Sequence, residues 1–273
     1  MIAIEVRRVG FTYPGGVRAL DGVDLSVGPG ETLGIIGQNG SGKSTLVRHL
    51  DGLLRPTEGQ ILLDGSVVGR RHVAELAGLV GIAFQDPDRQ IFAGRVRTEV
   101  AFGPRNLGLR GAELDRRVTE ALDMVGLAGT DEENPYDLGY SRRKLLAVAS
   151  VLAMRTPIVV LDEPTTGQDL RGVARVRAIT AALAAEGRTV ITISHDMRFV
   201  AETVRRMVVM RAGRIVLDGT PADVFAAANW NVLASTYLEP PLAALVGARL
   251  GVGSTPTEAS LVEALGRAHV DAG

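Results

Sequence analysis

The chain has 273 residues, of which 46% are hydrophobic, enough for one large α/β domain and a smaller appendage. Its formal net charge of −1 excludes a general basic field, so we expect no nucleic-acid partner. Cysteine is absent, which excludes disulfides, thiolate metal sites and cysteine nucleophiles.

Membrane-spanning and exported proteins are also disfavoured. No stretch approaches the ~18 consecutive apolar residues of a spanning helix. The N-terminus lacks the apolar core of a signal peptide and carries Glu5, Arg7 and Arg8 early. These features predict a soluble, cytoplasmic protein that contacts a membrane only through a partner.

The N-terminal region is predicted to form a small β-sheet. Strand-like patterns at 2–9 and 23–27 flank a turn-rich segment at 11–16, and 61–65 reads as a further strand and turn. Tyr13 lies in that first turn and could offer its ring to a nucleobase. For Phe11, in the same turn, packing within the small sheet is a better explanation than contact with a nucleobase.

Residues 37–45 have the sequence of a phosphate-binding loop. An apolar run at 33–36 precedes the loop and an amphipathic stretch follows it, the context in which G-x-x-x-x-G-K-[ST] is credible. Of the 30 basic residues only Lys43 and Lys144 are lysines, so a compact ammonium at position 43 points to phosphate. We expect Lys43 to reach the β- and γ-phosphates and Ser44 to ligate Mg²⁺. The predicted nucleotide-binding residues are Tyr13, Gly37, Gln38, Asn39, Gly40, Ser41, Gly42, Lys43, Ser44 and Thr45.

Polar residues end three further predicted strands. Gln85 follows 80–84, Asp162 and Glu163 follow the apolar run 158–161, and His195 follows 190–194. Runs without alternation are typical of parallel strands buried on both faces, whose carboxyl ends meet at the ligand-binding edge. For a nucleotide hydrolase, Asp162 and Gln85 would hold Mg²⁺, Glu163 would orient or deprotonate water, and His195 would donate to the γ-phosphate. The alternatives are a helix cap for the carboxylates, a solvated glutamine and a structural histidine.

The remaining patterns complete a three-layer α/β domain. Residues 95–155 are predicted to be largely helical, as an insert between Gln85 and the strand at 158, and 207–210 is a further strand. From 229 the chain differs: a short helix is expected near 242–250. Thr255 is expected to cap a second helix, with Pro256 at its first position and Glu258 in a capping box. Two such helices cannot form a core alone, so they dock on the chain's own domain or on a partner subunit.

With its motifs in this order, the chain resembles the ATP-binding subunit of an ABC transporter from about residue 2 to 225. Tyr13 matches the adenine-stacking position, 37–45 the Walker A loop, Gln85 the Q-loop, 158–163 Walker B, 166–169 the D-loop and His195 the switch histidine. Segments 84–92, 193–202 and 218–225 resemble ATPases of energy-coupling-factor importers, which take up vitamins such as biotin or metal ions such as cobalt and nickel. The tail resembles the C-terminal extension by which those ATPases pair.

The resemblance implies a P-loop NTPase with ABC ATPase architecture: an N-terminal antiparallel β subdomain, a parallel-sheet core, a helical insert and a C-terminal helical extension. The ATP-binding domain would span 1–228, with the helical subdomain at about 95–155, and the extension 229–273. ATP and Mg²⁺ are the implied cofactors. The implied partners are a second ABC ATPase subunit, in a homodimer or heterodimer, and integral membrane transport subunits. The chain would then hydrolyse ATP at the cytoplasmic face of the membrane to power uptake.

The signature motif, usually LSGGQ, departs from the family pattern. The motif's place is taken by Gly139, Tyr140, Ser141 and Arg142. The resemblance implies that they form the loop that, in the family, closes over the γ-phosphate bound to the opposite subunit. The usual serine hydroxyl is lost at Gly139, and Tyr140 replaces a glycine that permits close backbone approach. The cations at 142–144 oppose the helix dipole, which indicates a nearby anion or full solvation. Gln168 in the D-loop is a second departure, since an apolar residue is common there.

Two other functions stay open. A soluble, non-transport ABC ATPase usually carries paired cassettes or long coiled-coil insertions, which this chain lacks. A regulatory subunit that binds ATP and hydrolyses it slowly fits the altered signature but not the intact Glu163 and His195. An unrelated P-loop kinase would not need both Gln85 and His195. The transported substrate cannot be identified, because ATPase subunits of this family do not contact it.

Overall fold

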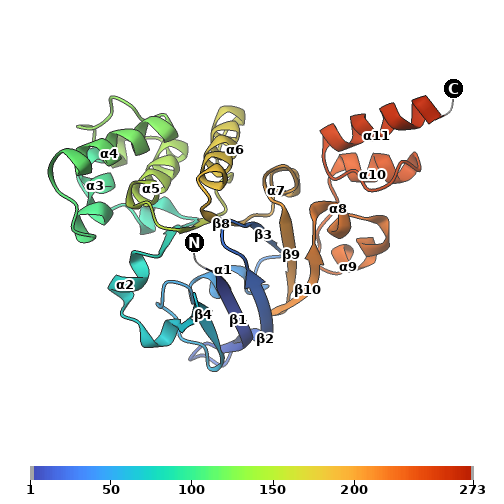
Figure 1. Ribbon diagram of the computed structural model, residues 1–273, viewed down its shortest axis with the longest axis horizontal. Helices are drawn as coiled ribbons and strands as arrows, with labels where there is room; N and C mark the ends of the chain where they lie inside the picture. Colours follow the sequence, from blue (N-terminus) through green and yellow to red (C-terminus); the bar gives the residue numbers. More distant parts are fainter. Residues whose placement is uncertain (1–2, 272–273) are drawn as a thin grey trace.

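The structure is a computed structural model that describes residues 3–271 as two β-sheets with helices around them (Figure 1). Residues 1–2 and 272–273, which the predicted domain ranges include, lie outside the described residues. Among the described residues, no helix is both long enough and apolar enough to cross a membrane.

The predicted N-terminal sheet is present. Its strand order is β2-β1-β4-β5, with β1 paired antiparallel to β2 and β4. Burial alternates along most of β2, so one face of this sheet packs inward and the other faces solvent. The turn begins two residues later than predicted, because β1 continues through Phe11 to Thr12. The strands are β1 Ile4–Thr12, β2 Arg18–Val27, β4 Glu58–Leu63 and β5 Ser66–Val67.

The second sheet forms the core, in the order β10-β9-β3-β8-β7-β6. The strands from β9 to β6 run parallel, as predicted, and β3, β7 and β8 are buried along their whole length. Strand β10 pairs antiparallel to β9 at the edge and was not predicted. The strands are β3 Thr32–Ile36, β6 Val80–Ala83, β7 Ile158–Asp162, β8 Thr189–Ile193, β9 Arg206–Arg211 and β10 Arg214–Gly219.

Helices α3, α4 and α5 pack together between β6 and β7 in the chain and form the predicted helical insert. They lie at one end of the molecule, with α10 and α11 at the opposite end (Figure 1). The buried positions of α4 are the periodic apolar residues that predicted it. The helices are α1 Lys43–Val47, α2 Val73–Ala77, α3 Val96–Asn106, α4 Gly111–Val125, α5 Tyr140–Met154, α6 Leu170–Ala185, α7 Met197–Thr203, α8 Pro221–Val224, α9 Trp230–Ala234, α10 Leu242–Arg249 and α11 Glu258–Asp271.

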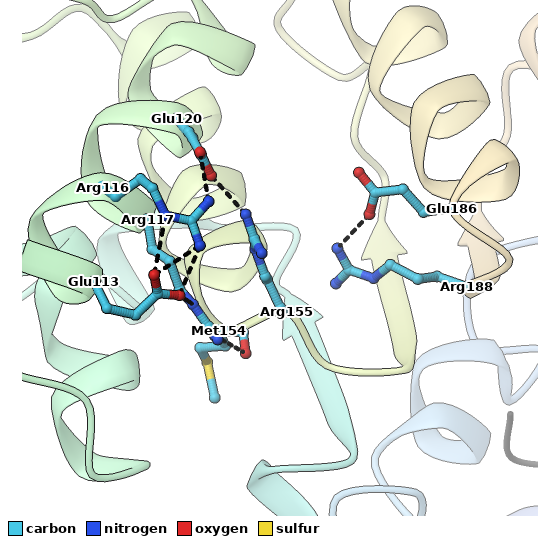
Figure 2. A network of polar contacts seen from close by, with 8 residues as sticks. All are labelled: Glu113, Arg116, Arg117, Glu120, Met154, Arg155, Glu186 and Arg188. Carbon is cyan, nitrogen blue, oxygen red and sulfur yellow. Dashed lines mark hydrogen bonds and ion pairs between the residues drawn. The ribbon is translucent and has the colours of Figure 1, made fainter.

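A charged network links α4 to the end of α5 (Figure 2). Within α4, Glu113 pairs with Arg116 and Arg117, and Glu120 pairs with Arg116 and with Arg155, the residue that follows α5. Most of these side chains are partly exposed, so the pairs contribute little net stability. The apolar residues of α4 and α5 lie in one buried cluster, which holds the insert together.

The tail docks partly on the chain's own domain. Leu233, Leu238 and Ala244 belong to the main hydrophobic core, which settles the docking of α9 and α10. Helix α11 packs on α10 but leaves Val262 70% and Leu265 40% exposed. Most of the tail therefore docks on the chain's own domain, the first of the two alternatives. An apolar stripe on α11, formed by Val262 and Leu265, stays exposed.

The prediction that Thr255 caps α11 is wrong. Thr255 is 1% exposed, and its hydroxyl donates to the carbonyl oxygen of Ala243 at 2.7 Å. Gly247 of α10 makes this contact possible, because a Cβ there would collide with the Thr255 side chain. The helix begins at Glu258, and Thr257 Oγ1 accepts the first capping bond from Ser260 N at 3.1 Å.

Candidate active site

The loop at 37–42 connects β3 to α1 at the carboxyl edge of the core sheet. Gly37, Gly40 and Gly42 have φ angles of 151°, 79° and 104°, which only glycine adopts without strain. A Cβ at Gly42 would lie 2.6 Å from the carbonyl oxygen of Ala19. The glycines of the motif are therefore required by both backbone conformation and space.

Lys43 is folded into this loop. Its side chain is 7% exposed, and Nζ donates to the carbonyl oxygens of Gly37 at 2.7 Å and Gln38 at 2.9 Å. Burial lowers the pKa of Lys43, while the carboxylates of Glu163 and Asp162 act in the opposite direction. The ammonium thus lies between its own loop and the carboxylates at the end of β7.

Most of the predicted nucleotide-binding, metal and catalytic residues line one cavity of about 330 Å³. Gly37 and Gln38 lie outside its lining and contact Lys43 instead. A hollow of about 420 Å³ beside the antiparallel sheet contains none of the predicted site residues. The lining of the first cavity comprises Tyr13, Val17, Arg18, Ala19, Asn39, Gly40, Ser41, Gly42, Lys43, Ser44, Thr45, Gln85, Asp162, Glu163 and Ile193.

Asp162 ends β7 and is 5% exposed. Burial raises the pKa of Asp162 and the neighbouring charge of Glu163 adds to the effect, whereas a hydrogen bond from the Ser44 hydroxyl opposes it. In the described part of the chain, Asp162 Oδ1 is buried and has no hydrogen-bond partner. A free buried carboxylate oxygen beside a hydroxyl suits a hard divalent cation such as Mg²⁺.

No cluster of three or more histidine, aspartate or glutamate side chains that could hold a metal exists among residues 3–271. An ion at Asp162 would therefore take most of its ligands from phosphate oxygens and water, which is how Mg²⁺ is usually held beside nucleotides. The donor set of Ser44, Gln85 and Asp162 fits such an ion.

Glu163 has an unusual backbone. Its φ angle is 51°, in the left-handed region, which costs a non-glycine residue about 1–3 kcal/mol. Its N–H donates to the carbonyl oxygen of Ile193 at 2.8 Å, and His195 Nδ1 lies 2.7 Å from Oε2. The carboxylate is 6% exposed and is held against the end of β8. Strain of this kind persists where the surrounding structure fixes it, and it is concentrated at functional sites.

The carboxylate pair does not cap a helix, so that alternative is wrong. The following helix, α6, begins at Leu170 and is capped by Asp169, which accepts from Gly172 N at 2.7 Å. The His195 side chain is 66% exposed and contacts Glu163, and it lies outside the lining of the cavity. Its donation to the γ-phosphate stays a prediction.

Tyr13 and Gln85 both line the cavity. The Tyr13 hydroxyl lies 3.1 Å from Thr45 Oγ1, which fixes its ring above the end of the loop. Gln85 follows β6, and the segment that carries it is fixed by Gln90. Gln90 Oε1 accepts from Phe84 N, and Nε2 donates to Ala147 O in α5, both at 3.0 Å. Gln90 was not singled out in the sequence, because a single glutamine in a loop carries no distinctive pattern.

The signature segment lies away from this cavity. Gly139 precedes α5, which begins at Tyr140, and none of Gly139, Tyr140, Ser141 and Arg142 lines the cavity. The cations that follow have anionic neighbours: Arg142 is 4.0 Å from Glu133, and Arg143 is 3.0 Å from Asp88. Of the two explanations for these cations, the nearby anion applies and full solvation does not.

Comparison with known proteins identifies relatives over most of the chain. Residues 20–166 match the family described as ABC transporter. The energy-coupling factor transporter ATP-binding protein EcfA of Methanothermobacter thermautotrophicus is 41% identical over 224 residues, 81% of this chain and 72% of that protein. A relative from Caldanaerobacter subterraneus is 40% identical over 92% of this chain, which spans 44% of that longer protein.

Two solved structures are similar in fold and sequence. CbiO1 of Clostridium perfringens, described as part of the ABC transporter complex cbiONQ, superposes with a TM-score of 0.75 at 33% identity, covering 91% of this chain and 98% of that one. The dimeric ATP-binding cassette MJ0796, solved in a post-hydrolysis state with ADP and Pi, gives 0.73 at 26% identity, covering 80% of this chain and 98% of that one.

Proposed function

Because this chain belongs to the ABC transporter family of ATP-binding proteins, we propose that it is the ATPase subunit of an energy-coupling-factor importer. It hydrolyses ATP to power uptake of a vitamin or a transition-metal ion. The name of the Methanothermobacter relative and the cbiONQ complex of the structural neighbour support this assignment.

One observation carries the hydrolytic function: the buried, backbone-strained Glu163 is held by His195 beside the phosphate loop. In the proposed mechanism, Lys43 binds the β- and γ-phosphates and Tyr13 stacks on the adenine. Glu163 orients or deprotonates the attacking water. His195 positions that carboxylate and contacts the γ-phosphate as charge develops.

Ser44, Asp162 and Gln85 would hold Mg²⁺, which neutralises charge on the phosphate oxygens when it is bound. The unpartnered Oδ1 of Asp162 supports this role. The other two residues place a hydroxyl and an amide oxygen on the same cavity wall.

A second ATPase subunit is needed to complete the site. The segment Gly139 to Arg142 does not line this chain's cavity, so it is available to cover the nucleotide of a partner. The dimer of MJ0796 supports this arrangement. We propose the ranges 1–228 for the ATP-binding domain, with its helical subdomain at about 95–155, and 229–273 for an extension that helps the subunits pair.

The surface for the membrane subunit is a groove between β6, α3 and α5. This apolar groove has a volume of about 360 Å³. The residues that line it include four exposed apolar side chains: Leu53, Val73, Phe92 and Phe102. Phe92 and Phe102 stack edge to face with ring centroids 4.7 Å apart. Exposed apolar side chains gathered in this way mark binding surfaces. A helix of the membrane subunit docked here would hold the chain at the cytoplasmic face of the membrane.

The test is ATP turnover of the complex purified with its membrane subunits. Glu163→Gln should keep ATP affinity and lower turnover by about 10²–10⁴-fold, the range of a general base. Glu186→Gln after α6, an exposed glutamate that does not line the cavity, is the matched control. Unchanged turnover of Glu163→Gln at saturating ATP would contradict the proposed mechanism.

A further inference from the structure

The two departures from the family's motifs contact each other within this chain. Ser141 Oγ donates to Gln168 Oε1 at 2.7 Å, and Gln168 Nε2 donates to the carbonyl oxygen of Ser141 at 3.0 Å. Beside this pair, the Tyr140 ring covers Gly167, where a Cβ would lie 2.6 Å from ring Cε1. The start of α5 and the loop before α6 are therefore matched in shape and in hydrogen bonding.

Lys144 adds a charged contact to the same loop. It is 2% exposed, and its Nζ donates to the carbonyl oxygen of Thr166 at 3.1 Å. Burial lowers the pKa of Lys144 to about 8, and the carboxylates of Glu163, Asp162 and Asp86 act against this shift. The second of the chain's two lysines thus points from the signature helix toward the catalytic carboxylates.

The loop continues directly to Glu163. Thr166 N donates to the carbonyl oxygen of Glu163 at 3.3 Å, and Thr166 Oγ1 donates to Glu163 Oε2 at 3.5 Å. Gln168 N donates to Thr165 O at 3.1 Å, which closes the next turn of the loop. A shift of α5 that moved Thr166 would therefore also move the carboxylate that His195 holds.

We propose that these contacts, all within one chain, couple the two ATP sites of the pair. When the signature segment binds the partner's nucleotide, the contacts place Glu163 in position in the chain's own cavity. The coupling rests on the proposed function, in which the signature segment acts in trans and Glu163 in cis. Ser141, Lys144 and Gln168 are positioning residues that act through the loop at 166–168. Continuous hydrogen-bond chains of this kind carry energetic coupling between sites.

The experiment uses the complete transporter with two differently tagged ATPase protomers, only one of which carries the variant. The partner's catalytic glutamate is changed to glutamine, so that turnover reports this chain's own cavity. Ser141→Ala and Gln168→Leu should each lower that turnover about fivefold, the effect of losing one hydrogen bond. The KM for ATP should change less than about twofold, and the double variant should be no slower than the slower single variant.

Two further variants separate coupling from a loss of folding. Gly172→Ala changes no bonding group, but its Cβ collides with Gln168 Oε1, so it should reproduce Gln168→Leu. Thr180→Val removes a buried hydroxyl bond within α6 that does not reach the loop, and it should leave turnover unchanged. Melting temperatures equal to that of the wild-type complex exclude unfolding as the cause.

Unchanged turnover in this chain's cavity for Ser141→Ala and Gln168→Leu, or losses that add in the double variant, would overturn the coupling. A signature segment that acts only in trans gives that result. Its variants then lower turnover only in the reciprocal complex, in which Glu163 is changed to glutamine and the partner's glutamate is intact. If Glu163→Gln itself leaves turnover intact, the proposed function fails instead. The two failures are therefore distinguishable.

Discussion

The side-chain ammonium of Lys43 is held by the backbone of its own loop. Its ammonium donates to two carbonyl oxygens of the loop, so the cation is already placed at the point where phosphate binds. An ammonium has three donors and can exchange a carbonyl for a phosphate oxygen without moving the loop. The position therefore suits lysine better than the arginine used almost everywhere else in the chain.

We expect Lys43→Ala to lower ATP affinity by about 100-fold or more, because two contacts from a charged donor, each about 1.5–3 kcal/mol, are lost. Titration of the purified subunit with a fluorescent ATP analogue measures this. Arg267→Ala, which removes an exposed cation on α11, is the control and should bind normally. Wild-type affinity in Lys43→Ala would contradict the phosphate-loop interpretation.

The sequence predicted several of the residues that line the cavity but not how they pair. Asp162 and Glu163 were predicted as neighbours because they end an unbroken apolar strand, and the structure places them in the cavity. The contact of Glu163 with His195 depends on a φ angle of 51° that no residue pattern reveals. Lys144 was noted as a rare lysine and as one of three cations at a helix start, but its contact was not predicted, because its partner is a backbone carbonyl and every residue has one.

At the scale of elements, α3 and α5 form the groove that we assign to the membrane subunit. Phe92 is 59% exposed and Phe102 48%, so a charge at either position leaves the core intact. We expect Phe92→Asp with Phe102→Asp to abolish co-purification of the membrane subunits while ATP affinity of the isolated subunit is kept. Leu250→Asp is the matched control, because Leu250 is an exposed apolar residue that follows α10, the helix at the other end of the molecule. Normal co-purification of the groove variant would move the membrane contact to another surface.

The sequence predicted the helices and strands whose apolar residues follow a clear pattern. It did not predict those that depend on contacts with distant parts of the chain. The buried face of α4 and the apolar runs of β7 and β8 follow from residue type alone. Strand β10 is half-exposed and pairs with a neighbour on one side only, so its sequence lacks the continuous apolar run of the inner strands. The start of α11 was misplaced because Thr255, a good capping residue, is bonded across to Ala243 instead.

At the scale of the whole molecule, an apolar stripe on α11 formed by Val262 and Leu265 lies uncovered. Deleting residues 229–273 would also remove Leu233, Leu238 and Ala244 from the main core, so loss of pairing in that variant would be ambiguous. Val262→Asp with Leu265→Asp changes only exposed positions. We expect this double variant to weaken pairing of the ATPase subunits in sedimentation experiments without changing the melting temperature. Association equal to that of the wild type would restrict the tail to packing within its own chain.

The last prediction concerns the two ATP sites of the assembled pair, which we expect to be unequal in a heterodimer. This chain's own set of Lys43, Gln85, Glu163 and His195 is complete, so ATP bound here is hydrolysed if the partner supplies an ordinary signature segment. Over the partner's ATP, this chain offers Gly139 without a hydroxyl and the 41% exposed ring of Tyr140. Losing even one contact to a charged group, about 1.5–3 kcal/mol, slows that site by tenfold or more.

Turnover of the complex after each catalytic glutamate is changed in turn measures the asymmetry. Glu163→Gln should remove most of the activity, and the equivalent change in the partner should remove little. Gly139→Ser should then raise turnover at the partner's site severalfold, because nothing lies within 4 Å of a Cβ at Gly139 and the bonds between Ser141 and Gln168 are untouched. Equal losses from the two glutamate changes would contradict unequal sites. Full activity of this subunit paired with itself would contradict the heterodimer, because the altered signature segment would then cover both nucleotides.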